Sequence, residues 1–180
     1  MSKHIFWIAS YPKSGNTLLR AILSCLFFSK DGTFSFELIK SIQSLENKWR
    51  LNFIKKDSPK DFLLLDNNKV LSKYWLQLQS KTNMRLKEDF IFLKTHHALV
   101  RYDNYPFTIE NNCRGYFYII RDPRDVAVSW AKHSEISINK SIDFLINELS
   151  GTEWNHSKES LLPKSITPKI VLSSWEKNIK

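Results

Sequence analysis

A short apolar segment, a polar turn and an amphipathic helix open the chain, and this order constrains the fold more than any other feature. Residues 4–10 are mostly apolar and of types that favour strands, so they predict a short buried strand. Residues 11–15 are turn-forming, and apolar residues then recur at helical spacing to about Phe28. A strand, loop and helix in this order indicate the first part of a parallel α/β unit.

Two later apolar runs end in polar residues, as buried parallel strands do. Residues 90–93 lead into two histidines, and residues 116–120 end at Arg121. After Arg121, an Asp-Pro pair predicts a helix start, with the helix itself over residues 126–133. The alternation predicts a three-layer α/β fold with a mainly parallel sheet flanked by helices, and a ligand at the carboxyl ends of the strands.

The remaining segments predict covering helices around one core. Leu38, Ile42 and Leu45 repeat at helical spacing, and further apolar residues repeat over residues 63–78. Three C-terminal segments complete this interpretation: an amphipathic helix over 138–149, a polar loop over 151–168, and a helix beginning within 170–180. A chain of 180 residues suits one core, so residues 1–180 are interpreted as a single domain.

Charge and cysteine content narrow the class of protein. Lys and Arg number 27 against 18 Asp and Glu, a formal charge of +9, which favours anionic partners without choosing among them. The two cysteines make no disulfide framework and have no neighbouring metal ligands, so we expect no metal. No segment resembles a secretion signal or a membrane span, and the cytoplasm is the expected location.

The loop after the first strand has the composition of a phosphate cradle. Gly15 permits close backbone approach to an anion, and the first N–H groups of the following helix lack internal partners. Ser14, Asn16 and Thr17 add side-chain donors, while Lys13 adds a positive charge. This is not a Walker A loop, because the lysine precedes the glycine. The alternative is an ordinary loop before a capped helix.

Two more polar clusters follow predicted strands. Arg121 can bind a phosphate through two parallel hydrogen bonds, and Ser129 can donate another. Alternatively, Arg121 simply pairs with Asp125. Lys94 and the imidazole of His96 follow the second strand, where a histidine can act as a general base or serve structure alone.

Together and in this order, these segments resemble the cytosolic sulfotransferase family, over roughly the whole chain. Residues 11–17 are similar to the loop that holds the 5′-phosphosulfate end of 3′-phosphoadenosine 5′-phosphosulfate (PAPS). Residues 121–129 are similar to the 3′-phosphate-binding segment, in which an Arg and a Ser eight positions later contact that group, and residues 94–96 to the segment with the catalytic histidine. The resemblance implies a P-loop NTPase-like sulfotransferase fold.

The family pattern also includes a later strand and a basic, glycine-containing segment that closes over the 3′ end of the donor. Residues 174–176 resemble the helix leading to that strand, and no residues match the basic segment. The resemblance therefore implies a chain truncated at its C-terminus.

The resemblance further implies metal-free sulfuryl transfer from PAPS to a hydroxyl or amine of a small-molecule, glycan or lipid acceptor. His96 would take the acceptor's proton, although the adjacent His97 could point into the site instead. Lys13 would stabilise charge on the leaving phosphate oxygen, and Lys94 would steady the sulfuryl group. The acceptor pocket would lie among residues 34–86 and 151–168, where Trp49, Trp75 and Trp154 are either pocket walls or core.

Three other interpretations stay open. The first is a truncated, inactive relative that still binds PAPS or a nucleotide. The second is a nucleotide-dependent phosphotransferase, for which Asp122 is the one convenient magnesium ligand. The third is nonspecific nucleic-acid binding by a basic, aromatic-rich surface, although no recognisable module supports specific binding.

Overall fold

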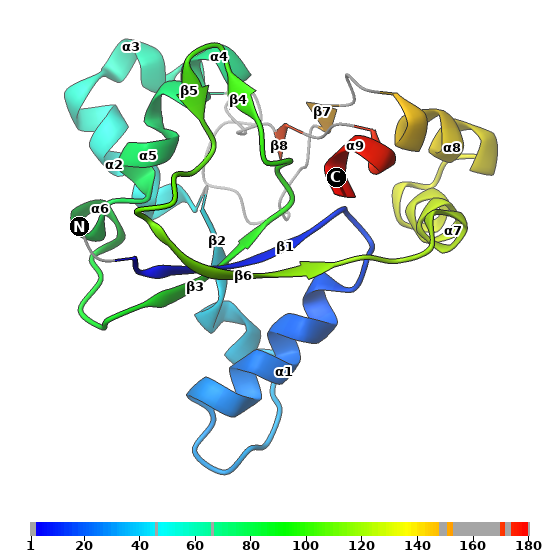
Figure 1. The fold of residues 1–180 in the computed structure, drawn as a ribbon, viewed down its shortest axis with the longest axis horizontal. Helices are drawn as coiled ribbons and strands as arrows, with labels where there is room; N and C mark the ends of the chain where they lie inside the picture. Colours follow the sequence, from blue (N-terminus) through cyan, green and yellow to red (C-terminus); the bar gives the residue numbers. More distant parts are fainter. Residues whose placement is uncertain are drawn as a thin grey trace.

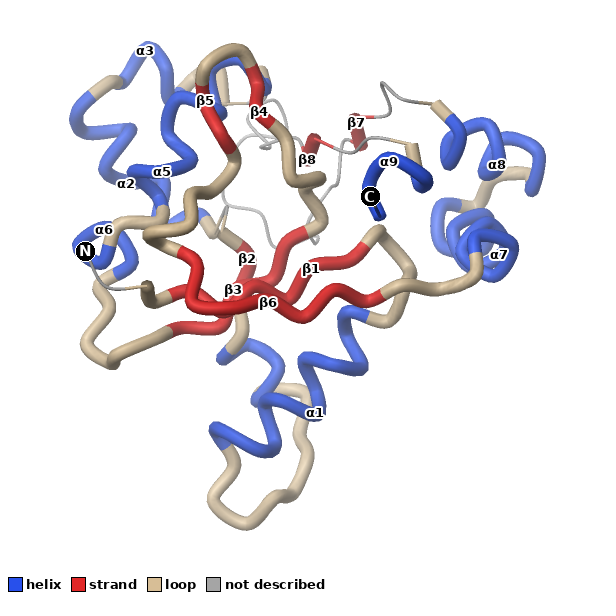
Figure 2. The backbone as a smooth tube through the Cα atoms, in the orientation of Figure 1, coloured by secondary structure: helices blue, strands red, loops and turns tan. Residues whose placement is uncertain are grey.

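A four-stranded parallel sheet lies at the centre of the computed structural model, which describes residues 3–45, 47–65, 67–147, 151–152, 170–171 and 174–179. In spatial order its strands are β2 (Gln43–Ser44), β3 (Ile91–Thr95), β1 (Ile5–Ser10) and β6 (Cys113–Ile119). Helices flank the sheet on both faces (Figures 1 and 2). The predicted mainly parallel α/β fold is confirmed.

Successive side chains of β1 point to opposite faces of the sheet, and each face packs against an apolar layer. Phe6 and Ile8 face α1 (Asn16–Phe28) and pack with Leu23 of that helix. Ile5 and Trp7 face the opposite layer, in which they are buried. Because both faces of the strand are covered, the apolar run of residues 5–8 does not alternate with polar residues, as expected for a parallel sheet.

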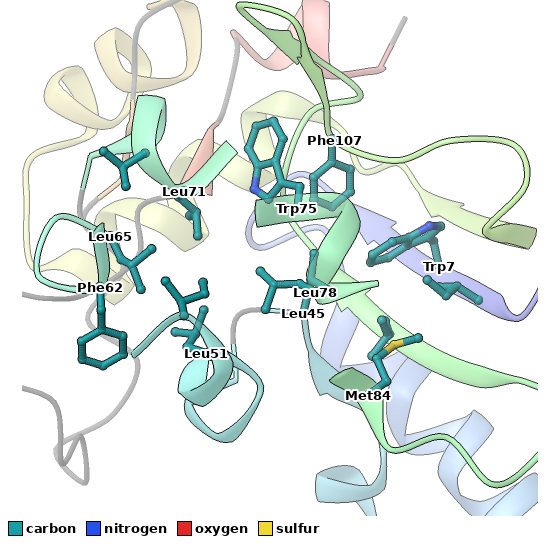
Figure 3. Close-up of a cluster of buried hydrophobic side chains, with 14 residues drawn as sticks. Trp7, Leu45, Leu51, Phe62, Leu65, Leu71, Trp75, Leu78, Met84 and Phe107 are labelled. Carbon is teal, nitrogen blue, oxygen red and sulfur yellow. The ribbon is translucent and has the colours of Figure 1, made fainter. Parts of the chain in front are cut away.

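The layer opposite α1 contains the largest hydrophobic core. Trp75 and Leu78 are fully buried there, with Phe107 nearly so (Figure 3). Short helices and single turns supply most of this layer: α2 (Lys48–Asp57), α3 (Pro59–Phe62), α4 (Asn68–Leu71), a 3₁₀ turn (Ser72–Tyr74), α5 (Trp75–Leu78) and α6 (Lys81–Met84). The covering helices predicted over residues 63–78 are present from Asn68 onward, divided into short pieces, whereas residues 63–65 form a turn.

A third cluster forms beyond the carboxyl end of the sheet. Helices α7 (Pro123–Ser134) and α8 (Ile138–Ile146) pack against each other, and α9 (Trp175–Ile179) lies near them (Figure 1). Tyr11, from the loop after β1, is fully buried against Val126 of α7. This contact ties the first loop to a helix more than a hundred residues later in the chain.

The prediction of a helix through Leu38, Ile42 and Leu45 is wrong. The segment forms one 3₁₀ turn (Leu38–Ser41) and then enters the sheet as β2. The guanidinium of Arg20, whose pKa is lowered by burial, donates hydrogen bonds to the carbonyls of Ile39 (2.9 Å) and Ile42 (2.6 Å). These carbonyls are therefore engaged by a side chain from α1, a tertiary contact that apolar spacing does not reveal.

The C-terminal predictions are partly corrected. The helix expected over 138–149 ends at Ile146, and residues 148–149 lie outside the described residues. Within 170–180, Ile170–Val171 form the strand β8 against β7 (Gly151–Thr152), and the helix starts only at Trp175. Most of the predicted polar loop, including Trp154, lies outside the described residues.

A small hairpin completes the described part of the chain. Strands β4 (Arg101–Tyr102) and β5 (Tyr105–Pro106) follow β3 in the sequence and pair antiparallel as a separate two-stranded sheet. None of the described helices is long and apolar enough to span a membrane.

Candidate active site

The loop between β1 and α1 holds an unusual backbone. Lys13 has φ of 67°, a left-handed conformation that is costly for a residue with a side chain, and Gly15 has φ of 112°. A hydrogen bond from the Ser14 N–H to the Tyr11 carbonyl (3.2 Å) closes the turn. The loop thus turns sharply and presents the start of α1 at the carboxyl end of the sheet.

The N-terminus of α1 has no side-chain cap and no acidic residue in its first turn. Its first N–H groups therefore keep the partial positive charge that attracts anions. The Ser14 hydroxyl beside them is buried, and among the described residues it has no hydrogen-bond partner. Buried hydroxyls are normally paired, so an anion at the helix start would satisfy an unmet requirement. Thr17 is exposed in the first turn.

Asn16 is buried and faces back toward the sheet. Its Nδ2 donates to the Ile8 carbonyl (3.0 Å) and to the Ser10 hydroxyl (3.2 Å). The Asn16 side chain therefore fixes the helix start to the end of β1 and is directed away from the surface, which differs from the role of an anion donor predicted from sequence.

His96 belongs to the same network. Its Nδ1 lies 2.8 Å from the Ser10 carbonyl and 3.2 Å from the Ser10 hydroxyl. A carbonyl oxygen only accepts, so Nδ1 carries the proton and donates. In the neutral ring the lone pair is then on Nε2, which is the atom that can accept a proton. Ser10, which sequence reasoning left as a strand end, is thus the residue that orients His96.

His97 lies in a different environment. Its ring stacks on Phe107, with centroids 4.8 Å apart, and meets Trp75 edge-on at 5.4 Å. Its backbone N–H donates to the Thr95 hydroxyl (3.0 Å). His97 is therefore part of the aromatic layer opposite α1, whereas His96 contacts the end of β1.

Arg121 and Lys13 are brought together from opposite halves of the chain. Nη1 of Arg121 donates to the Lys13 carbonyl (3.2 Å), and Nε lies 3.6 Å from Asp125 Oδ2. The ion pair is exposed, so it contributes little to stability and can give way to a competing anion. The pairing anticipated as the alternative to phosphate binding is present, and it leaves the arginine at the first loop.

Helix α7 begins as its sequence predicts. The Asp122 side chain accepts the Arg124 N–H (2.9 Å) and binds the Arg124 guanidinium, and these bonds lower the pKa of Asp122 to about 2. This carboxylate is engaged in helix capping, which weakens the case for a magnesium ligand. Ser129 lies half-buried in the second turn of α7.

Lys94 is half-buried on β3, opposite Ile8 of β1 and Ser44 of β2. Its register places it on the sheet face that α1 covers, one residue before the last residue of the strand. The structure therefore brings Lys13, His96, Arg121 and the start of α1 to one end of the sheet, with Lys94 on the neighbouring strand.

A cavity of about 700 Å³ lies on the other sheet face, opposite α1. Its lining includes Ala9 and Thr95, which directly precede Ser10 and His96. Trp7, His97, Phe107 and Tyr118 also line it. Burial raises the pKa of Tyr118 to about 12, so its hydroxyl is protonated and donates to Asn178 of α9. Trp75 lies in the core behind this lining, and Trp49 is half-buried elsewhere, with its Nε1 bound to Gln43.

No three His, Cys, Asp or Glu side chains within the described ranges are grouped to hold a metal ion. The expectation of metal-free chemistry stays a prediction.

Replacement of Gly15 by alanine is expected to destabilise the fold by about 1–2 kcal/mol through backbone strain. A Cβ at this position meets only Ile119 Cγ2, at an ordinary 3.7 Å, so packing adds little. Gly32→Ala is a matched control, because φ is 77° and no described residue lies within 4 Å of a Cβ added there. Urea unfolding should give similar losses for both variants, and a far larger loss at Gly15 would contradict a purely conformational cost.

Comparison with known protein families identifies the family of this chain. A sequence model of the family described as Sulfotransferase domain matches residues 3–180. A search of curated protein sequences gave no match. Since the match covers nearly all of the chain, from before β1 to the end of α9, this protein belongs to the sulfotransferase domain family.

Proposed function

We propose that this protein transfers a sulfuryl group from PAPS to a hydroxyl or amine acceptor. The observation that carries the proposal is the contact between Arg121 and the Lys13 carbonyl, because it joins two candidate anion sites at one end of the sheet. A donor with phosphate groups at both its 5′ and 3′ positions needs two such sites. Sulfuryl transfer by a family member is the chemistry that best uses them.

The residues at the helix start fit the phosphosulfate end of PAPS. The Ser14 hydroxyl, which has no hydrogen-bond partner within the described part of the chain, the first N–H groups of α1 and the Lys13 ammonium would hold it. Arg121 and Ser129 would hold the 3′-phosphate. PAPS supplies the activated sulfuryl group when bound.

The acceptor hydroxyl or amine loses a proton during transfer, and a side chain of this protein would take it up. With Nδ1 of His96 donating to the Ser10 carbonyl, the lone pair of the neutral ring is on Nε2, which would accept the proton of the acceptor hydroxyl or amine. Lys13 and Lys94 would stabilise negative charge during transfer. Ala9 and Thr95, which line the cavity, directly precede Ser10 and His96, and this supports the cavity as the place where a small-molecule, glycan or lipid acceptor would bind.

The cytoplasm is the location that we propose. Cys25 and Cys113 are both free, which suits a reducing compartment.

Arg121→Ala is expected to weaken binding of adenosine 3′,5′-bisphosphate about 10- to 100-fold, because charge-assisted hydrogen bonds to the 3′-phosphate are lost. Titration calorimetry on the full chain measures this directly. Arg101→Ala removes the same charge from an exposed position on the β4 strand and should leave the affinity within about twofold.

Two results would redirect the proposal. No binding by a folded wild-type chain would reject PAPS as donor. Tight binding without transfer to any acceptor would favour a relative that binds the nucleotide and does not catalyse.

A further inference from the structure

A buried glutamine holds one wall of the cavity beside the candidate base. Gln79 follows α5 and has no exposed surface, and its side chain reaches the segment of residues 107–108. We propose that Gln79 is a positioning residue that sets the shape of the acceptor cavity. This inference rests on the proposed function, since it takes the cavity to be the place from which an acceptor reaches His96.

Every polar end of Gln79 contacts a different group. Nε2 donates to the Phe107 carbonyl (2.5 Å), and Oε1 accepts from the Thr108 hydroxyl (2.7 Å). Its backbone carbonyl accepts from Nε2 of His4 (2.8 Å), at the start of β1. The residue therefore links α5, the central strand and the cavity wall through three directional bonds.

The aromatic rings carry this constraint toward the candidate base. Phe107 stacks on His97, and its centroid lies 5.2 Å from that of Trp7 and 5.4 Å from that of Trp75. Phe107, His97, Trp7 and Thr108 all line the cavity. A change in the Phe107 backbone would move the ring on which His97 rests, and His97 directly follows His96.

An apolar side chain could fill the same space without needing partners. A buried amide is tolerated only when it is fully bonded, and its bonds fix direction more sharply than packing does. The wall residues Phe107 and Thr108 have no regular secondary structure of their own. The Phe107 N–H donates to the Val100 carbonyl (2.9 Å), and Gln79 adds the bonds to the Phe107 carbonyl and to the Thr108 hydroxyl.

The test compares Gln79→Met, which keeps length and loses the amide, with Gln77→Met, at an exposed position on α5 two residues earlier. The probe is 2-naphthol, a rigid aromatic alcohol that suits an aromatic cavity. At saturating PAPS, Gln79→Met should raise the KM for 2-naphthol about tenfold, as expected for loss of one or two positioning bonds. The KM for PAPS should stay within about twofold, and Gln77→Met should match the wild type.

A second measurement does not depend on transfer. Direct binding of 2-naphthol, followed by tryptophan fluorescence of the full chain, should weaken about tenfold in Gln79→Met. If the wild type binds 2-naphthol and transfers nothing, the proposed function fails while this inference stands. If the folded wild type does not bind 2-naphthol, the inference itself is overturned.

A matched pair at Thr108 covers the case in which Gln79→Met fails to fold. Thr108→Ser keeps the hydroxyl that donates to Gln79 and should retain wild-type affinity for 2-naphthol. Thr108→Val keeps the shape and loses the hydroxyl, so it should weaken binding several-fold. Equal affinities in the pair, or a lower melting temperature with unchanged naphthol binding, would mean that the network serves stability alone.

Discussion

Replacement of His96 by alanine is expected to lower kcat for sulfuryl transfer by about 10²- to 10⁴-fold, the usual contribution of a general base. The reason is the loss of Nε2, which carries the lone pair of the neutral ring while Nδ1 donates to Ser10. Steady-state kinetics with a fixed acceptor alcohol measure the effect. Affinity for adenosine 3′,5′-bisphosphate should change less than about twofold, because the residues proposed to bind its phosphate groups do not include His96.

Two other histidines serve as comparisons. His133→Ala alters an exposed residue of α7 and should leave kcat unchanged. His97→Ala removes a ring stacked on Phe107 and should mainly raise the acceptor KM. A larger loss of kcat in His97→Ala than in His96→Ala would identify His97 as the base instead.

Replacement of Lys13 by glycine is expected to abolish most activity and yet stabilise the fold. Glycine relieves the left-handed backbone at φ of 67°, which should raise the free energy of unfolding by about 1 kcal/mol. Loss of the ammonium should lower kcat by about 10²- to 10³-fold, as for other removed transition-state donors. Urea unfolding and initial-rate kinetics on the same preparation test both effects.

Variants at the same position separate charge from backbone. Lys13→Ala should lose activity as glycine does, without the gain in stability, and Lys13→Arg should keep part of the rate. Wild-type activity in Lys13→Gly would contradict any role for the ammonium. A lysine that strains its own backbone is the kind of conflict expected where function outweighs stability.

Much of the fold could be predicted because its strands and first helix follow strong local rules. The β1 strand, the loop and α1 lie within one residue of the predicted bounds, and Asp122 and Pro123 mark the start of α7 as expected. The prediction of a helix in the segment after α1 was wrong. Arg20 of α1 binds two carbonyls of that segment, and its end pairs with β3 as β2. Such contacts join distant residues, and apolar spacing carries no information about them.

The candidate site shows the same division. The sequence predicted that Lys13, Arg121 and His96 follow strands, and a parallel sheet brings strand ends together. It did not predict that Asn16 turns inward to hold Ser10, or that Ser10 orients His96. A polar residue at the end of an apolar strand was the available signal for Ser10. No sequence signal pointed to Gln79, because the partners of its side chain, Phe107 and Thr108, lie nearly thirty residues away.

The central position of β1 has a consequence for how the chain acquires its structure during synthesis. Ile5 pairs with Ile91 on one side and with Cys113 on the other, so β1 is made well before either of its two partner strands. Until both partners have left the ribosome, its apolar side chains have no sheet to join. The long segments that separate β1 from β3 and β6 must then close into loops before β1 can pair. This slows folding and prolongs the exposure of apolar side chains. Nascent chains are therefore expected to need chaperone protection of β1 until β3 and β6 have been made.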